Sequence, residues 1–209
     1  MTPYFETPQR TERLQLIVHL LNNASEIPYL RGAKGAGKQR FAQRLMKEYA
    51  EDFASIMIDG ADAVGLRQRL CAGLGLQIAH VQWPDDLFEA TGGRWLLIVI
   101  KHVEQLPSEV VYPLMELHQA GACVLLLGEG NVPDLPPHWR LQFVDLPPFT
   151  VEQSREFVLR QLGPGAELSE AKAQQLHRAS EGLPGRLLQT AAPPAQSAQT
   201  HTSSAVPSA

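Results

Sequence analysis

The residues best suited to chemistry in this sequence form a glycine-rich loop, Gly32-Ala-Lys-Gly-Ala-Gly-Lys38, which matches the pattern G-x-x-x-x-G-K. Glycines let the backbone curl until successive N–H groups point at phosphate oxygens, and the start of the next helix adds a partial positive charge. A plain glycine-rich turn is the alternative, but the loop lies between a strand pattern and an amphipathic helical pattern, the context that phosphate binding requires. We therefore expect ATP or ADP as the cofactor, held by Gly32, Ala33, Lys34, Gly35, Ala36, Gly37, Lys38 and Gln39.

The positions that normally bind Mg²⁺ in this motif are occupied by residue types that are poor Mg²⁺ ligands. Gln39 stands where the motif has a Ser or Thr whose short hydroxyl ligates the metal. Lys101 and His102 stand at the end of the third expected strand, where a metal-holding Asp and a catalytic Glu belong. They are either solvated charges or, for Lys101, a group that neutralises phosphate without metal. Glu104, past the strand end, is a candidate for a displaced catalytic carboxylate. We expect Mg²⁺ binding to be weakened and hydrolysis to be lost or greatly slowed.

The elements that must position these residues follow from the apolar pattern. Short β-rich runs alternate with helical patterns, which predicts a parallel α/β sheet. Helical spacing of apolar residues predicts helices over 41–49 and 110–117, and Pro113 should delay the start of the second helix or bend it. The expected strands are Ile27–Leu30, Ala54–Ile58, Trp95–Ile100, Ala122–Leu127 and Leu141–Val144.

The pattern becomes purely helical after residue 148. Thr150 begins a helix with a capping box, Ser169 caps a second helix, and Arg186 opens a short third one. The predicted organisation is a three-layer P-loop α/β domain over 1–148, a small helical lid over 149–190, and a linker or tail over 191–209.

Composition limits the classes of partner. The 209 residues carry a net charge of 18 − 22 = −4. Residues 1–50 hold eight Lys or Arg against four Asp or Glu, and the remaining residues hold ten against eighteen. With a pI near 6.0, local anion binding fits better than a nucleic-acid surface, which needs a broad basic face. Cys71 and Cys123 lie in apolar runs and are expected to be reduced core thiols, and no metal-ligand spacing exists.

The sequence shows neither a membrane-spanning pattern nor a targeting pattern. The longest apolar run, Trp95–Ile100, has strand length, far short of the roughly 20 residues of a membrane span. The N-terminus lacks the basic and apolar blocks of a signal peptide. Residues 191–209 are almost entirely Ala, Ser, Pro, Thr and Gln, which predicts a disordered tail or a linker within a longer protein. A cytoplasmic location is expected.

The opening segment Tyr4–Arg10, a helix running to Leu21, the P-loop and the order of later elements resemble the AAA+ ATPase domain of the ExeA, general-secretion type, over about residues 4–190. The resemblance extends to the N-terminal domain of DamX-like cell-division proteins that carry a SPOR domain. It implies an AAA+-like P-loop NTPase fold in a cytoplasmic domain. It also implies a linker leading to a membrane span and a periplasmic SPOR domain outside this sequence.

The resemblance also implies roles for residues beyond the P-loop. Glu129 or Asn131 matches the polar sensor segment after the fourth strand, and Arg186 matches a lid arginine that contacts the γ-phosphate. Arg140 matches an arginine finger that acts on a neighbouring subunit, so oligomer formation is open. Each of these could instead be a solvated side chain or a turn residue. Lys34 is either an accessory phosphate contact or a solvated charge.

The sequence leaves three hypotheses for the function open. The first is a degenerate AAA+ nucleotide-binding module with little or no hydrolysis, acting as a regulatory or interaction domain with protein partners of cell-envelope biogenesis or division. The second is an active ExeA-like ATPase in which Glu104 or a partner subunit supplies the missing carboxylate. The third is a DNA-associated AAA+ regulator, which the acidic pI disfavours.

Overall fold

A computed structural model describes residues 4–23, 26–78, 82–130, 135 and 139–191 of the chain. The sensor candidate Asn131 and residues 192–209 of the expected tail lie outside the described residues. No helix in the described part of the chain combines the length and the apolar character that crossing a bilayer requires.

Five parallel strands form one sheet in the order β2-β3-β4-β1-β5. Each strand matches its predicted run to within one residue at either end. Because all strands point the same way, their carboxyl ends meet at a single edge, and the P-loop leaves β1 at that edge. The strands are β1 (Ile27–Arg31), β2 (Phe53–Asp59), β3 (Trp95–Lys101), β4 (Cys123–Gly128) and β5 (Leu141–Asp145).

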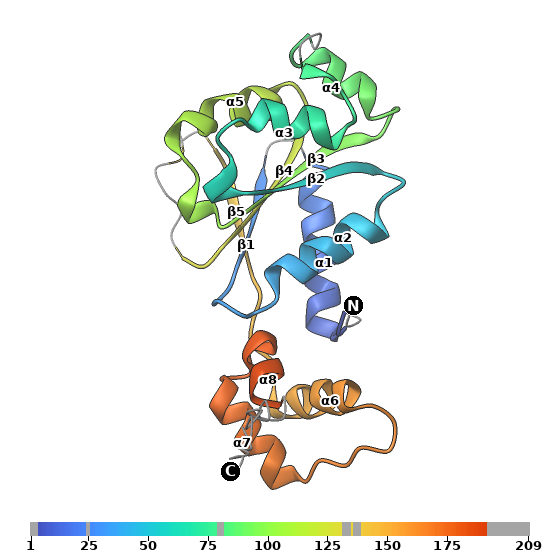
Figure 1. Ribbon diagram of the computed structural model, residues 1–209, viewed down its shortest axis with the longest axis vertical. Helices are drawn as coiled ribbons and strands as arrows, with labels where there is room; N and C mark the ends of the chain where they lie inside the picture. The colour runs from blue at the N-terminus through green and yellow to red at the C-terminus, as the bar shows by residue number, and fades with distance from the viewer. Residues whose placement is uncertain (1–3, 24–25, 79–81, 131–134, 136–138, 192–209) are drawn as a thin grey trace, which may run out of the picture.

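Helices cover both faces of the sheet and make the predicted three layers (Figure 1). Helices α1 (Pro8–Leu21) and α2 (Lys38–Glu48) pack on one face, and α3 (Leu66–Gly73), α4 (Asp85–Ala90) and α5 (Ser108–Gln119) pack on the other. Alternate residues of β3 point into the two cores, and the residues from Leu96 to Ile100 are fully buried. This explains why β3 is a continuous apolar run rather than an alternating one.

Two details of the helices differ from the sequence prediction. Helix α5 begins at Ser108 and continues through Pro113, so the expected late start is wrong. Proline removes one backbone donor, and tertiary packing of Val110, Leu114 and Leu117 keeps the helix in place. Helices α3 and α4 had no specific prediction, because they are short and their apolar residues are few.

Three helices follow β5 and form a small core of their own. They are α6 (Val151–Leu162), α7 (Glu170–Ser180) and α8 (Pro184–Ala191). The predicted capping box at Thr150 and the predicted cap at Ser169 are both confirmed. Phe5, from the segment before α1, completes this core by packing edge-on against Phe149 and Phe157, with ring centroids 5.2 and 5.5 Å away. The N-terminal segment therefore joins the lid to the α/β domain.

We expect Phe157→Ala to lower the free energy of unfolding by about 3–5 kcal/mol, because the ring is 2 % exposed and its loss leaves a cavity among aromatic neighbours. Chemical denaturation followed by circular dichroism measures the change. Leu162→Ala on the same helix is the matched control, since Leu162 is 51 % exposed. Equal losses in the two variants would contradict a lid core centred on Phe157.

Candidate phosphate-binding site

The glycine-rich loop connects β1 to α2 at the carboxyl edge of the sheet. Gly35 and Gly37 have φ angles of 90° and 91°, a left-handed conformation that side chains with a Cβ rarely adopt. Gly37 is the N-cap of α2, so the unpaired N–H groups of the first helical turn open toward the loop. Ala36 is fully buried, while Lys34 and Gln39 are exposed. The loop thus has the backbone shape of an anion cradle.

Lys38 folds back onto its own loop. Its Nζ donates to the carbonyl oxygens of Gly32 at 2.5 Å and Ala33 at 3.2 Å. Burial lowers the pKa of this ammonium, and the nearby charges of Glu129 and Glu104 partly oppose that shift. A phosphate oxygen entering the loop would compete with the two carbonyls for the same three N–H donors.

The two residues in place of the catalytic acids are tied to a carboxylate on the neighbouring strand. Lys101 Nζ lies 2.8 Å from Asp59 Oδ2, and His102 Nδ1 lies 3.0 Å from Asp59 Oδ1. The hydrogen bond from Lys101 is the main cause that holds the pKa of Asp59 near 2. The parallel register of β2 and β3 places Asp59 directly opposite Lys101. Sequence reasoning missed Asp59, because only the sheet order shows that β2 lies beside β3.

This cluster does not fit Mg²⁺. Asp59 already has an ammonium partner, and Lys101 would repel a second cation. Among the described residues, no group of three or more His, Cys, Asp or Glu side chains is arranged to hold a metal ion. Phosphate fits better, because the loop offers backbone N–H groups and the Lys38 ammonium.

Glu104 is the carboxylate that the structure brings toward the P-loop. It accepts a hydrogen bond from the backbone N–H of Glu129. The Tyr29 hydroxyl lies 3.4 Å from the same oxygen, but its single proton has a closer acceptor in the Gly130 carbonyl at 2.9 Å. Burial opposes ionisation of Glu104, but the N–H donors and the charge of Lys38 outweigh it and lower its pKa. Burial and the adjacent carboxylate raise the pKa of Tyr29 to about 12, so its hydroxyl stays a donor. Glu104 is therefore an ionised group held at the ends of β1 and β4.

The lid touches the P-loop directly. The N–H of Gly185, in the first turn of α8, donates to the Gly35 carbonyl at 2.9 Å. A Cβ at Gly185 would lie 3.0 Å from the Gly35 Cα, so the close approach favours glycine at position 185, while Gly35 is favoured by its positive φ. Arg186 follows this contact, but its guanidinium is exposed and pairs with Glu181 at 2.6 Å. Its backbone lies at the P-loop while its side chain is held within the lid.

Arg10 is a second residue at this site that sequence reasoning missed. Its guanidinium is buried, donates from Nη2 to the Ala36 carbonyl at 2.8 Å, and lies 4.6 Å from the centre of the Phe149 ring. A buried cation is costly unless it is paired or hydrogen-bonded, so these contacts hold it in one geometry. Arg10 links α1, the P-loop and the entry to the lid. Its place in a Thr-Pro-x-Arg helix start gave no sequence signal for this role.

The remaining candidates lie at different distances from the loop. Glu129 follows β4 at the same edge, is exposed, and is close enough to Lys38 to affect its pKa. Arg140 is exposed and directly precedes β5, at the amino edge of the sheet. Since the P-loop is at the carboxyl edge, Arg140 cannot reach a nucleotide held by its own chain.

No family model matches this sequence, and no curated protein matches it. The fold is similar to that of a chain in the structure of Drosophila ORC bound to DNA, with a TM-score of 0.57 and 18 % sequence identity. The match covers 87 % of this chain and 52 % of that chain, so this chain spans about half the length of its neighbour. The chain has the P-loop NTPase fold. At this identity the likeness concerns the fold alone.

The ion pair with Lys101 should make Asp59 a source of acid sensitivity. We expect Asp59→Asn to lower the free energy of unfolding by about 0.5–1 kcal/mol at neutral pH. Because the pKa of Asp59 is depressed to about 2 in the fold, its contribution is complete above its ordinary value and is lost as pH falls from about 4 to 2. The difference between the two proteins, measured by denaturation at several pH values, should shrink over that range. Asp62→Asn, an exposed residue in the next turn, is the control and should show no such trend.

Arg10→Lys keeps the charge but loses the planar fork that reaches the Ala36 carbonyl and stacks on Phe149. We expect a loss of about 1–3 kcal/mol in the free energy of unfolding, because the buried carbonyl is left without its donor. Arg13→Lys is the control, since the half-buried Arg13 makes one long hydrogen bond, 3.3 Å to the Asp145 carbonyl. If Arg10→Lys were as stable as the control, the contacts of the Arg10 guanidinium would not contribute to the free energy of unfolding.

Proposed function

We propose that this chain is a nucleotide-binding module of the P-loop class that binds ATP or ADP without needing Mg²⁺ and hydrolyses ATP slowly or not at all. The observation that carries the proposal is the contrast between two parts of one site. The glycine-rich loop has the left-handed glycines, the helix start and the lysine that phosphate binding uses. The metal side of the site instead holds Lys101 and His102, paired with Asp59.

Such a module acts through its conformation rather than through turnover. Phosphate in the loop would draw Lys38 from the Gly32 carbonyl and alter the loop next to Gly35, where the lid is hydrogen-bonded. We therefore propose a regulatory or interaction role in which the position of the lid signals whether nucleotide is bound. The resemblance of Tyr4–Arg10 and the P-loop to ExeA- and DamX-like domains supports a place in cell-envelope biogenesis or division, with protein partners there and a cytoplasmic setting.

An active ATPase is the second candidate, and Glu104 is the observation that favours it. The carboxylate is ionised and lies near Lys38, as a water-activating group must. The hydrogen bond from the Glu129 N–H, however, occupies one of its oxygens. We rank this function second because the described residues include no group of three or more His, Cys, Asp or Glu side chains that could hold a metal ion.

A DNA-associated role has less support. The ORC structure contains DNA, but its likeness to this chain is one of fold. The net charge of −4 and the pI near 6.0 speak against a duplex-binding surface, which needs a broad basic face.

Calorimetric titration with ATP and with ADP, with and without Mg²⁺, tests the proposal. We expect a Kd of roughly 1–100 μM that is unchanged by Mg²⁺, and at least about a tenfold loss in Lys38→Ala, because a direct charge on phosphate is removed. Lys47→Ala, an exposed lysine of the same helix, is the matched control.

Two outcomes would contradict the proposal. No binding of either nucleotide would show that the fold serves as a scaffold without a ligand. Mg²⁺-dependent turnover that disappears in both Lys38→Ala and Glu104→Gln would establish the active ATPase instead.

A further inference from the structure

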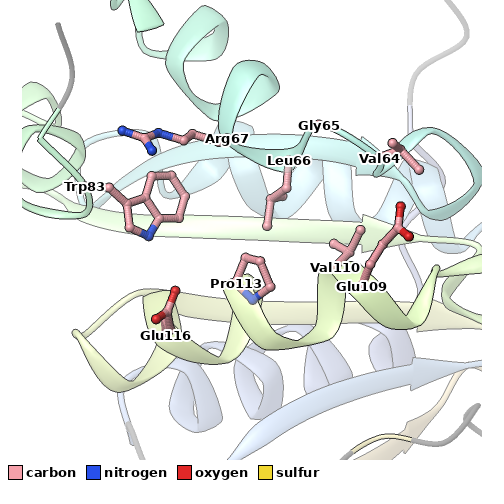
Figure 2. Close-up of a pocket in the computed structure, with 9 residues that line it drawn as sticks. All are labelled: Val64, Gly65, Leu66, Arg67, Trp83, Glu109, Val110, Pro113 and Glu116. Atoms are coloured by element: carbon pink, nitrogen blue, oxygen red, sulfur yellow. The ribbon is translucent and has the colours of Figure 1, made fainter. Parts of the chain in front are cut away.

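A separate groove lies between α3 and α5, and no P-loop residue lines it. Its volume is about 350 Å³ and it is open along one side. Figure 2 shows α3 on one wall and α5 on the other, with the lining side chains turned toward the space between them. The lining residues are Val64, Gly65, Leu66, Arg67, Trp83, Glu109, Val110, Pro113 and Glu116.

The floor and one wall of the groove are apolar. Leu66 and Val110 are 4 % exposed and belong to the core beneath, while Val64 at the rim is 60 % exposed. The Trp83 ring closes one end, with the Arg67 guanidinium 5.5 Å from its centre. An aliphatic side chain placed here would cover both the exposed valine and the flank of the indole.

The wall made by α5 presents hydrogen-bond acceptors. Glu109 and Glu116 are seven residues apart on one face, about 10 Å along the helix, and neither makes an ion pair within the described part of the chain. Pro113 lies between them and has no N–H, so the Glu109 carbonyl lacks the donor that the fourth following residue would normally supply. The α5 wall therefore places two carboxylates, and a carbonyl without its usual helical donor, beside the apolar floor.

We propose that this groove docks a segment of a partner protein in which aliphatic side chains are flanked by lysine or arginine. The aliphatic groups would fill the space over Leu66, Val110 and Pro113, and the cations would pair with Glu109 and Glu116. The complementary charge selects the occupant, because an acidic or neutral segment would leave both carboxylates without partners.

The C-terminal end of this chain is not that occupant. Residues 187–209 contain no Lys and no Arg, so they lack the required charge. The proposal is also independent of nucleotide binding, since the groove shares no residue with the P-loop. A partner bound here would contact Val64 and Glu109, which follow the ends of β2 and β3 beyond the Asp59–Lys101 pair.

Fluorescence anisotropy with two synthetic peptides tests the proposal. The first probe is a labelled peptide of Leu and Val residues with two flanking lysines, and the second is identical except that both lysines are glutamates. We expect the basic peptide to bind with a micromolar Kd and the acidic peptide to bind at least about tenfold more weakly. The double variant Glu109→Gln/Glu116→Gln should weaken the basic peptide about three- to tenfold, and Val64→Asp should alter the apolar rim and also change its affinity.

The control is Glu12→Gln/Glu51→Gln, which removes two exposed glutamates outside the groove and should leave peptide binding unchanged. ATP titration of the groove variants should give the wild-type Kd, which separates this proposal from the proposed function. Failure of the basic peptide to bind, equal binding of the acidic peptide, or no effect of the groove variants would overturn it. Self-association in sedimentation that is lost in Val64→Asp would assign the groove to a second copy of this chain instead.

Discussion

The parallel direction of all five strands is the constraint on which the rest of this structure depends. Because every strand ends at the same edge, the P-loop after β1, Asp59 on β2, Lys101 on β3 and Glu129 after β4 are gathered there from distant parts of the sequence. The entry to the lid leaves β5 at this edge too. In open parallel sheets ligands bind at this edge, and the surrounding loops decide what chemistry occurs.

The edge is closed on one side by a ring of contacts that includes a buried cation. Arg10 connects the Ala36 carbonyl to the Phe149 ring. Phe149 in turn donates its backbone N–H to the Gly182 carbonyl in the lid at 2.8 Å. Gly185 then returns to Gly35. Each contact is short and polar or aromatic, so the loop and the lid cannot move far without breaking one. If the loop binds phosphate as proposed, these contacts would connect phosphate binding to lid position.

On the other side of the edge, Lys101 and Asp59 balance each other's charge. A lone lysine at the end of β3 would be a charge without a partner, and the Asp59 carboxylate opposite it supplies one. The pair also joins the turns that follow β2 and β3, where Gly60 lies so close to the His102 carbonyl that a Cβ would clash. The Asp59–Lys101 pair is thus a structural joint between these two turns, and the groove between α3 and α5 begins just beyond it.

The sequence by itself determined the strands, the glycine-rich loop and the two lid caps, because each depends on local rules: apolar runs, left-handed glycines and side-chain capping at Thr150 and Ser169. It also drew attention to Lys101 and His102 at the end of β3, where the motif led us to expect acids; that interpretation stays a prediction. Only the tertiary structure decided their partner, since Asp59 is distant in sequence and becomes adjacent through the β2–β3 register. The same holds for Arg10, whose burial depends on the P-loop and Phe149 meeting over it. Pairing across strands and between domains is set by the free energy of the whole packed core, which no local pattern encodes.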